Sequence, residues 1–382
     1  MNKDMLFYTN NISNLYHGDV RDVLKSLASE SVHCVVTSPP YWGLRDYQTE
    51  GQLGLESTPE EYCANMVEVF REVRRVLNST GTVWLNLGDS YSSGSRTTTT
   101  NDTLRGDTPV NVTRTPVVDG IKPKDLVGIP WRVAFALQAD GWYLRSDIIW
   151  NKPNPMPESV TDRPTKAHEY IFLLTKSPKY YYDIDAIKEQ ATQDRWGGHS
   201  PMNRNNSKDK DDIYRGLTRE RDMMPEFRNK RSVWEINTHP YPGAHFATYP
   251  EKLVEPCILA GTSEKGVCAK CSKPWVKLTE VVSVPDRSTR DNRIGVIPGR
   301  DSATRMNSKE MKRVEKADLG WEPTCECSAD TVPATVLDPF IGSGTTCAVS
   351  QRLGRHSIGI DASAEYLDLA SKRIGKISMP MF

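Results

Sequence analysis

Short apolar segments alternate with helical segments along this chain, and this alternation leaves few kinds of fold open to it. Ser31–Thr37 is a mostly β-branched run that two prolines end, and Thr82–Leu87 is the next apolar run. Between them, Thr58–Glu61 combines a capping Thr, a Pro at the first helical position and a Glu three residues after the cap. This combination predicts the start of a helix, and we expect that helix to end near Gly81.

The same alternation returns at the far end of the chain, where Thr335–Leu337 and His356–Ile360 predict strands. The other expected strands are Asn14–Asp19, Tyr143–Trp150 and Tyr170–Thr175, the last two paired with each other. The other expected helices are Asp22–Ala28, Pro130–Ala139, Pro250–Leu259, Thr346–Leu353 and Ala364–Ile374. Strands that alternate with helices favour an α/β fold with a mostly parallel sheet and helices on both of its faces.

Composition excludes several classes of protein. Of the 382 residues 37% are hydrophobic, which is enough for a sizeable core. Lys and Arg number 49, as do Asp and Glu, and the resulting zero net charge excludes a histone-like protein that binds nucleic acid by bulk charge. No stretch approaches the ~18 apolar residues of a membrane span, and the start lacks the apolar region of a signal peptide. Eight cysteines then indicate reduced thiols or a metal site, so we expect a cytoplasmic protein.

A glycine-rich turn follows the apolar strand near the C-terminus. Gly342 and Gly344 lie where the strand passes into a helix, which would let the backbone approach a ligand. Asp361 ends the next strand and is placed to accept hydrogen bonds from ribose hydroxyls. Asp338 at the first strand end would repel a pyrophosphate but suit a cationic group. The pattern therefore indicates a nucleoside that carries an amine, such as S-adenosylmethionine, with a tight turn that binds no ligand as the alternative.

A proline-built turn, Thr37-Ser38-Pro39-Pro40-Tyr41-Trp42, follows the first buried strand. Neither proline has an N–H, so the turn is a rigid array of hydrogen-bond acceptors beside an aromatic ring. Ser38 and the Pro39 carbonyl could accept both hydrogens of an exocyclic amino group while Tyr41 stacks on the base. The alternative for this motif alone is a proline-rich connection whose aromatic residues belong to the core.

Together the two motifs resemble those of the β group of amino-methylating DNA methyltransferases, which act on the exocyclic nitrogen of cytosine or adenine. In that family a (D/N/S)PP(Y/F/W) tetrapeptide is catalytic and an FxGxG turn binds S-adenosyl-L-methionine. Here they are Ser38-Pro39-Pro40-Tyr41 and Phe340-Ile341-Gly342-Ser343-Gly344, in the order typical of the β group. The resemblance covers residues 14–91, 125–182, 245–262 and 335–376. It implies a permuted Rossmann-like fold of the S-adenosylmethionine-dependent methyltransferases, with a central, mostly parallel sheet and three insertions.

The resemblance also implies roles for individual residues, with Ser38, Pro39, Pro40 and Tyr41 catalytic. His17-Gly18-Asp19 resembles the strand-end acid near the cofactor, and His245–Leu253 resembles the segment that lines its methionine end. Trp150–Pro155 resembles the segment behind the target-base pocket. The residues expected to bind the cofactor are Asp19, Phe246, Thr248, Pro250, Asp338, Phe340, Gly342, Gly344, Thr345 and Asp361.

The expected organisation follows from placing these motifs along the chain. Residues 1–91 are the catalytic half of the core, 92–124 a flexible loop, 125–185 a continuation of the core, and 186–240 a target-recognition region. Residues 241–264 carry a cofactor-binding helix, 265–330 a cysteine-tied insertion, and 331–382 the cofactor-binding half of the core.

The implied reaction is direct attack of the amino group of a flipped-out base on the sulfonium methyl. Hydrogen bonds to Ser38 and Pro39 would localise the amino lone pair, and positioning would supply most of the acceleration. Ser at position 38 favours N4 of cytosine by family association, with N6 of adenine as the first alternative. RNA methylation is a second alternative, and a zinc-containing DNA-binding protein with an inactive core is the alternative that is not an enzyme.

A cysteine nucleophile, as in the carbon-5 cytosine methyltransferases, requires a thiol after a proline. Pro256-Cys257 is the only such pair in the sequence. It lies within the apolar part of the expected Pro250–Leu259 helix, so we interpret Cys257 as a core residue rather than a nucleophile.

Four other cysteines form two close pairs, Cys268 with Cys271 and Cys325 with Cys327. Four thiolates in two pairs can form a closed tetrahedral zinc site, which would be structural because no position is left for water. The single residue between Cys325 and Cys327 is a tight spacing for such a site. The alternatives are thiols without a ligand and, less favoured, a redox pair.

The resemblance implies double-stranded DNA as the partner and a prokaryotic or phage origin. A cognate restriction endonuclease and a homodimer are compatible with it. The residues expected to contact DNA are Trp42, Lys152, Arg228, Lys230 and Arg231, of which the last three form the densest basic cluster. The cysteine-tied insertion, which is also rich in Arg and Lys, is a second candidate for DNA contact.

Overall fold

A computed structural model describes residues 3–44, 51–92, 120–191, 227–239, 248–285 and 312–377. The chain divides into two compact units. The first comprises Met1–Ile187, Arg231–Trp275 and Pro323–Phe382, and the second comprises Lys188–Lys230 and Val276–Glu322. The expected target-recognition region at 186–240 therefore spans both units, because its last residues belong to the first.

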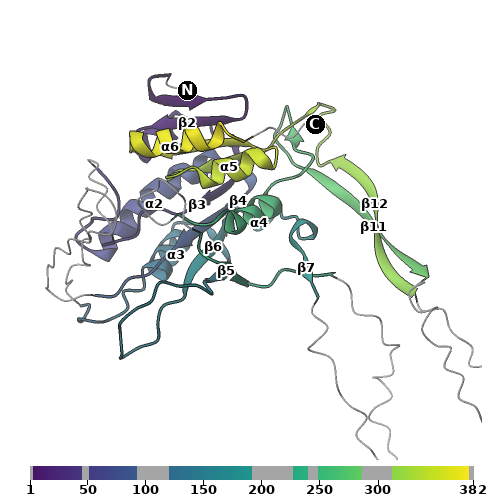
Figure 1. Cartoon of the computed structure of the whole chain (residues 1–382). Helices are drawn as coiled ribbons and strands as arrows, with labels where there is room; N and C mark the ends of the chain where they lie inside the picture. The colour runs from purple at the N-terminus through teal and green to yellow at the C-terminus, as the bar shows by residue number, and fades with distance from the viewer. Residues whose placement is uncertain are drawn as a thin grey trace, which may run out of the picture. The chain divides into compact units, whose positions relative to one another are not determined.

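The first unit is built on a nine-stranded sheet in the order β1-β2-β15-β14-β3-β4-β6-β5-β9 (Figure 1). The strands are β1 (Leu6–Thr9), β2 (Ser13–His17), β3 (Val32–Thr37), β4 (Leu77–Leu87), β5 (Tyr143–Asn151), β6 (His168–Thr175), β9 (Val233–Glu235), β14 (Thr335–Asp338) and β15 (His356–Asp361). The five adjacent strands β2, β15, β14, β3 and β4 run parallel, whereas β1 and β6 are antiparallel to their neighbours. The expected antiparallel pair is confirmed as β5 and β6, and β1 and β9 are additional strands.

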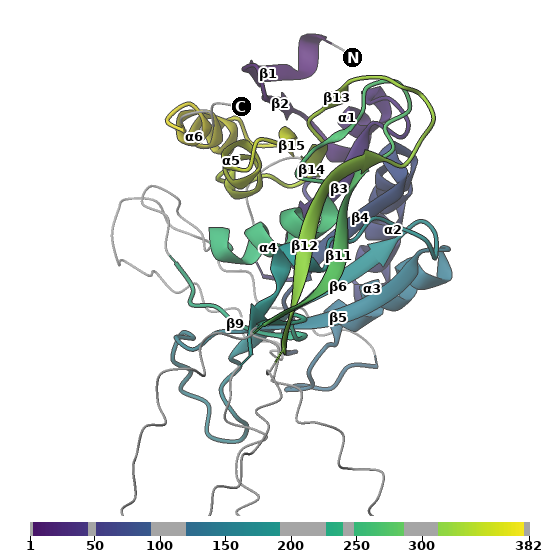
Figure 2. The same cartoon turned by 90° about the vertical axis from the view of Figure 1, so that its right-hand side faces the viewer.

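Helices cover both faces of this sheet, as Figures 1 and 2 show. The first face carries α1 (Val20–Ser26), α2 (Pro59–Val76) and α3 (Ile129–Ala139), and the second carries α4 (Glu251–Gly261), α5 (Thr345–Arg352) and α6 (Ala364–Ile374). Alternate residues of one strand serve the two faces: Val35 of β3 joins the core under α2, and Val36 joins the core under α4. Short 3-10 helices lie at Lys3–Met5 and Asp185–Ile187.

Helix α2 begins where the sequence predicts and ends earlier. The Thr58 hydroxyl accepts a hydrogen bond from the Glu61 backbone N–H at 3.1 Å and caps the helix. The helix ends at Val76, and β4 starts at once with Leu77, so the expected end near Gly81 is wrong. Gly81 instead lies within β4, where an added Cβ would come within 2.9 Å of the His33 carbonyl of β3. The glycine permits close approach of the two strands rather than ending a helix.

Strand β14, from the end of the chain, lies between β15 and β3 in the middle of the sheet. Val336 pairs with Cys34 and Leu337 with Val35 in parallel register. The carboxyl ends of β14 and β3 therefore meet at one edge of the sheet. The glycine-rich turn and the proline-built turn both start from this edge, after Asp338 and Thr37, which are 301 residues apart in sequence.

The remaining elements are short pairs of strands. In the first unit β10 (Val267–Cys268) pairs with β13 (Thr331–Val332). In the second unit β7 (Glu189–Gln190) pairs with β8 (Phe227–Arg228). Strand β11 (Trp275–Pro285) pairs with β12 (Lys312–Pro323), and all residues of this pair except Trp275 and Pro323 belong to the second unit. Every helix in the described parts of the chain is too short or too polar for a membrane span.

Candidate active site

The two motif turns are joined directly by a hydrogen bond. The Thr37 hydroxyl at the end of β3 donates to Asp338 Oδ1 at the end of β14, at 2.7 Å. Both side chains are buried. Because the bond is short and shielded from water, it holds the starts of the two turns in register.

Asp338 does not face an open ligand site, contrary to the expectation that its carboxylate meets a cationic group. It is 0% exposed and accepts four hydrogen bonds, from the Thr37, Tyr249 and Thr346 hydroxyls and from the Phe340 backbone N–H. Burial raises the pKa of this carboxyl, while these hydrogen bonds act in the opposite direction. Asp338 thus ties β14 to β3, α5 and the segment before α4.

The glycine-rich turn leaves room beside its backbone. Gly342 and Gly344 have φ values of +50° and +82°, in the left-handed region that favours glycine. A Cβ at Gly344 would come within 2.9 Å of the Ala370 Cβ of α6, whereas one at Gly342 would meet no atom within 4 Å. Gly344 thus lets the turn pack closely against α6, and the open space at Gly342 would let a ligand approach the backbone there.

Asp361 lies beside this open space at the end of β15. Its Oδ2 accepts from the Gly342 backbone N–H at 2.9 Å, and its Oδ1 accepts from the Ser363 backbone N–H at 2.9 Å. Burial raises the pKa of this carboxyl to about 6. A carboxylate still has lone pairs left after two such bonds, so it can accept further hydrogen bonds from a ligand.

The other expected cofactor residues lie at the same edge or outside the described residues. Asp19 caps α1 just after β2 and pairs with Arg21, whose hydrogen bond holds the pKa of the Asp19 carboxyl below its usual value. Thr345 accepts a hydrogen bond from Arg373 at 2.9 Å. Thr248 and Pro250 flank Tyr249, and Pro250 is the buried N-cap of α4. Phe246 falls outside the described residues.

The proline-built turn holds its acceptors in fixed positions. The Tyr62 hydroxyl of α2 donates to the Pro40 carbonyl at 2.8 Å, while the Pro39 carbonyl receives no hydrogen bond from the described residues. Ser38 Oγ donates to the Tyr41 hydroxyl at 3.2 Å. The Tyr41 ring lies against Gly88, where an added Cβ would come within 2.5 Å of it. The turn therefore presents Ser38 and Pro39 as the acceptors that remain available.

Trp42 is a correction to the expected DNA contacts. Its side chain is 1% exposed in the core under α2, and its indole N–H donates to the Glu56 carbonyl at 2.8 Å. A buried indole whose N–H is satisfied belongs to the core, so Trp42 does not contact DNA.

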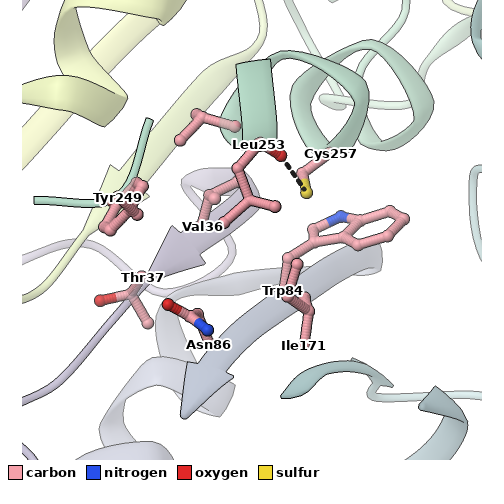
Figure 3. Close-up of a pocket in the computed structure, with 9 residues that line it drawn as sticks. Val36, Thr37, Trp84, Asn86, Ile171, Tyr249, Leu253 and Cys257 are labelled. Carbon is pink, nitrogen blue, oxygen red and sulfur yellow. Dashed lines mark hydrogen bonds between the residues drawn. The ribbon is translucent and has the colours of Figure 1, made fainter. Parts of the chain in front are cut away.

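A small pocket lies beside the end of β3 on the α4 face of the sheet (Figure 3). It is lined by Val36, Thr37, Trp84, Asn86, Ile171, Tyr249, Leu253, Val254 and Cys257. Thr37 and Asn86 come from the ends of β3 and β4, and Tyr249 comes from the segment before α4. The pocket thus lies next to the strand end that carries the proline-built turn, and the Tyr249 hydroxyl connects it to Asp338, before the glycine-rich turn, by a 2.7 Å hydrogen bond.

Two further polar residues of this site, Asn86 and Glu169, were not expected from the sequence. Asn86 Nδ2 donates to Glu169 Oε2 at 3.1 Å, and the Tyr41 hydroxyl donates to the same oxygen at 2.7 Å. Lys152 forms a close ion pair with Glu169 Oε1 and lies over the Trp150 ring. Polar residues at the ends of otherwise apolar strands were the available signal, because such positions reach the edge where ligands bind.

The sequence of the chain matches a known protein family. A family model described as DNA methylase, and named for N6 and N4 methyltransferases, matches residues 32–269 and 330–372. The chain belongs to this DNA methylase family. The expected resemblance to amino-methylating DNA methyltransferases is therefore confirmed.

The sequence similarity to individual relatives covers nearly the whole methylase. It is 42% identical over 357 residues to the type II methyltransferase M.SmaI of Serratia marcescens, a match that covers 94% of this chain and 89% of that protein. It is 40% identical over 372 residues to M.Cfr9I of Citrobacter freundii, covering 95% and 88%. The solved structure of PvuII DNA methyltransferase, named as cytosine-N4-specific, matches with a TM-score of 0.53 at 17% identity and covers 97% of this chain and 90% of that one. The expected permuted Rossmann-like methyltransferase fold is confirmed.

The four paired cysteines of the methylase come together within its first unit. The Sγ atoms of Cys268, Cys271, Cys325 and Cys327 all lie within 4.8 Å of one another. Tetrahedral zinc with Zn–S bonds of about 2.3 Å requires sulfur atoms about 3.8 Å apart, so the cluster fits such an ion. Backbone N–H groups of Cys271 and Lys270 lower the pKa of the Cys268 thiol to about 7, whereas the neighbouring Cys271 thiol raises the pKa of Cys327 to about 12.

The remaining expected residues lie in different surroundings. Arg228 pairs with Glu189 at 2.8 Å within the β7–β8 pair of the second unit, close to Lys230 in sequence. Arg231 is exposed in the first unit, and its carbonyl accepts from the Trp234 indole. Cys257 is 1% exposed inside α4, and burial in this apolar core agrees with its interpretation as a core residue.

Proposed function

We propose that this methylase transfers the methyl group of S-adenosyl-L-methionine to the N4 amino group of a cytosine flipped out of double-stranded DNA. The observation that carries the proposal is the hydrogen bond between Thr37 and Asp338. It joins the turn that offers amino-group acceptors to the turn that leaves open space at Gly342. A methyl donor bound at the glycine-rich turn could therefore pass its methyl group to an amino group held at the proline-built turn.

The residues at the glycine-rich turn fit an adenosyl group with a cationic sulfonium. Gly342 leaves room for the nucleoside, and Asp361 can accept hydrogen bonds from ribose hydroxyls. Thr248 and Pro250 would line the methionine end, next to Tyr249 of the pocket. When bound, the cofactor supplies a methyl group on a positive sulfur, which is already electrophilic.

The residues of the proline-built turn supply the other half of the reaction. The amino lone pair of cytosine is delocalised into the ring and is a poor nucleophile. Ser38 Oγ and the Pro39 carbonyl would accept one amino hydrogen each, localise the lone pair and orient it for in-line attack. As the N–C bond forms and the S–CH3 bond breaks, S-adenosylhomocysteine would leave, and the methylated nitrogen would release one hydrogen as a proton to solvent. The Tyr41 ring is backed by Gly88 and would stack on the base, which contributes ~1–3 kcal/mol toward its extrahelical position.

Adenine N6 is the second candidate target. A six-membered ring with an exocyclic amino group presents the same two hydrogens in either base, so the acceptors at Ser38 and Pro39 suit both. Ser38 favours cytosine by the family association of SPPY. An intact acceptor turn argues against an inactive core, because a binding module has no need of one.

We propose that the four-cysteine cluster holds a structural zinc ion. Its ligands would be the thiolates of Cys268, Cys271, Cys325 and Cys327, all within the first unit. Four thiolates close the coordination sphere, so the ion would stabilise the fold around β10 and β13 and take no part in methyl transfer.

The test is methyl transfer followed by identification of the product. Purified methylase, duplex DNA and radiolabelled S-adenosylmethionine should give labelled DNA, and digestion to nucleosides with mass spectrometry should give N4-methylcytosine. Ser38→Ala should lower turnover by a hundredfold or more, on the order of a lost transition-state contact, while cofactor binding survives. N6-methyladenine as the product would show that the target base is adenine and not cytosine. The absence of methyl transfer to DNA would refute the proposal.

A further inference from the structure

A chain of hydrogen bonds leads from the catalytic turn to a carboxylate on β6. Ser38 Oγ donates to the Tyr41 hydroxyl at 3.2 Å, and Tyr41 donates to Glu169 Oε2 at 2.7 Å. Glu169 lies near the start of β6, which is antiparallel to β4 and so begins at the edge where β3 and β4 end. Its side chain is 16% exposed. The acceptor turn is thus linked to a shielded negative charge.

A serine hydroxyl can donate as well as accept a hydrogen bond. Ser38 can accept from a target amino group without a competing donor only if its own proton is directed elsewhere. The Tyr41 oxygen is the group that takes this proton. The direction of the whole chain therefore depends on where the single hydroxyl proton of Tyr41 points.

Glu169 decides that direction, because an ionised carboxylate only accepts hydrogen bonds. The competing acceptor for the Tyr41 proton is Asn86 Oδ1, at the longer distance of 3.2 Å. The Asn86 amide itself donates to Glu169 and to the Tyr170 carbonyl, both at 3.1 Å. Two donors therefore converge on Glu169 Oε2, and the Tyr41 oxygen is left to accept from Ser38.

Two neighbouring features support this direction of the hydrogen bonds. Lys152, with a side chain only 18% exposed, forms a close ion pair with the other oxygen of Glu169 and so leaves Oε2 to accept from Tyr41 and Asn86. Burial and the Glu169 charge raise the pKa of Tyr41 well above its ordinary value, so the phenol keeps its proton and donates. The Lys152–Glu169 ion pair and the protonated Tyr41 phenol together make the hydrogen bonds run in one direction, from Ser38 through Tyr41 to Glu169.

We propose that Glu169 is a positioning residue that makes Ser38 present an acceptor, and not a donor, to the target base. The proposal rests on the proposed function and deepens it. A base with an exocyclic amino group matches this polarity, whereas a base with a keto oxygen at the same position places two acceptors against each other. Glu169 thus contributes, through Tyr41 and Ser38, to discrimination of cytosine from uracil.

The substitution Glu169→Gln tests this polarity with little change in shape. The Gln amide can donate to the Tyr41 oxygen, so Tyr41 can donate to Ser38 and Ser38 can donate to the base. The readout is binding, with S-adenosylhomocysteine present, of two duplexes that carry cytosine or uracil at the methylated position. Both target bases stand opposite an abasic site, so that the cost of flipping is equal.

We expect the preference of the wild type for cytosine over uracil to fall by roughly tenfold in Glu169→Gln, with kcat also reduced and cofactor affinity unchanged. The Pro39 carbonyl, which accepts in both proteins, accounts for the preference that remains. An unchanged ratio would overturn the inference. For a methylase that acts on adenine, the two bases compared are adenine and hypoxanthine.

Two further variants separate polarity from stability. Tyr41→Phe removes the oxygen that takes the Ser38 proton, and the double variant should lose no more of the preference than either single variant, since all three break one chain. If Glu169→Gln does not fold, Tyr41→Phe must show the same loss. Glu72→Gln removes an ion-paired glutamate of α2, 2.7 Å from Arg75, and should keep the preference and kcat. Wild-type protein that methylates no DNA contradicts the proposed function, whereas active wild type with an unchanged ratio in the variants contradicts only this inference.

Discussion

Single buried residues at the carboxyl edge connect parts of the chain that are far apart in sequence. Asp338 accepts from Thr37 and Thr346, and each of these hydroxyls comes from a different element. A carboxylate this deeply buried is tolerated because its oxygens are supplied with donors. The same contacts that satisfy its charge therefore also align the two motif turns.

His33 is a second buried polar residue with a defined protonation state. Its Nδ1 accepts from the Thr335 backbone N–H at 3.0 Å, which links β3 to β14 and requires the neutral ring. Burial lowers the pKa of His33 to about 4, below the ordinary value of 6.5. As the pH falls through this range, the unfolded chain takes up a proton that the folded protein does not, so the folded state loses stability.

We therefore predict that His33→Gln gains stability relative to wild type as the pH falls from 6.5 to 4. A Gln side-chain oxygen can accept from Thr335 but does not titrate, and the relative gain should reach about 3 kcal/mol. Urea unfolding of both proteins across this range measures it, with pH 8, where both side chains are neutral, as the reference. Parallel stability curves for the two proteins would contradict the prediction.

At the scale of elements, the four-cysteine cluster joins the chain segment before β11 to the chain segment after β12. Cys268 and Cys271 precede β11, Cys325 and Cys327 follow β12, and the Thr324 hydroxyl donates to the Pro274 carbonyl at 2.7 Å. The tight spacing of the second pair is compatible with convergence of all four sulfur atoms, because β10 and β13 bring the flanking segments together.

We predict that purified reduced protein contains one zinc ion per chain and that Cys327→Ser loses it. Loss of the ion removes a cross-link from the folded state, and the melting temperature should fall by about 2–4 °C for each kcal/mol lost. Elemental analysis and calorimetry measure the two effects. Lys270→Ala, which keeps all four thiols, serves as the matched control, and reduced wild-type protein without zinc would exclude the site.

At the scale of the whole molecule, the described chain divides into a core unit and a second unit made of two insertions. The nine-stranded sheet, both motif turns and the cysteine cluster all belong to the first unit. The residues that bracket Val276–Glu322 are close together, as the bond between Thr324 and Pro274 shows. This insertion can therefore be removed without pulling the sheet apart.

We predict that replacing Val276–Glu322 by a short Gly-Ser linker leaves the fold and cofactor affinity unchanged but weakens DNA binding by roughly tenfold at low salt. The insertion carries Arg and Lys residues that would neutralise phosphates, so the salt dependence of binding should also become shallower. Calorimetry with S-adenosylmethionine and fluorescence anisotropy with duplex DNA measure the two affinities. Unchanged DNA affinity would assign DNA contact to other segments, such as Arg228–Arg231.

The sequence by itself determined the fold class, the strand-turn-helix units and the two motifs of the methylase. These features are local, because a capping Thr58, a proline pair after β3 or a glycine turn after β14 acts on the few residues beside it. For the same reason the sequence also identified the four cysteines, whose spacing within each pair is local.

Tertiary structure alone decided what those residues contact. Trp42 follows the proline-built turn in sequence yet packs in the core, and Asp338 ends the strand before the glycine-rich turn yet is enclosed by donors from other elements. Asn86 and Glu169 joined the site only because β4 and β6 run antiparallel, which brings the end of one beside the start of the other. Such partners are set by long-range strand pairing and burial, which no pattern of neighbouring residues encodes.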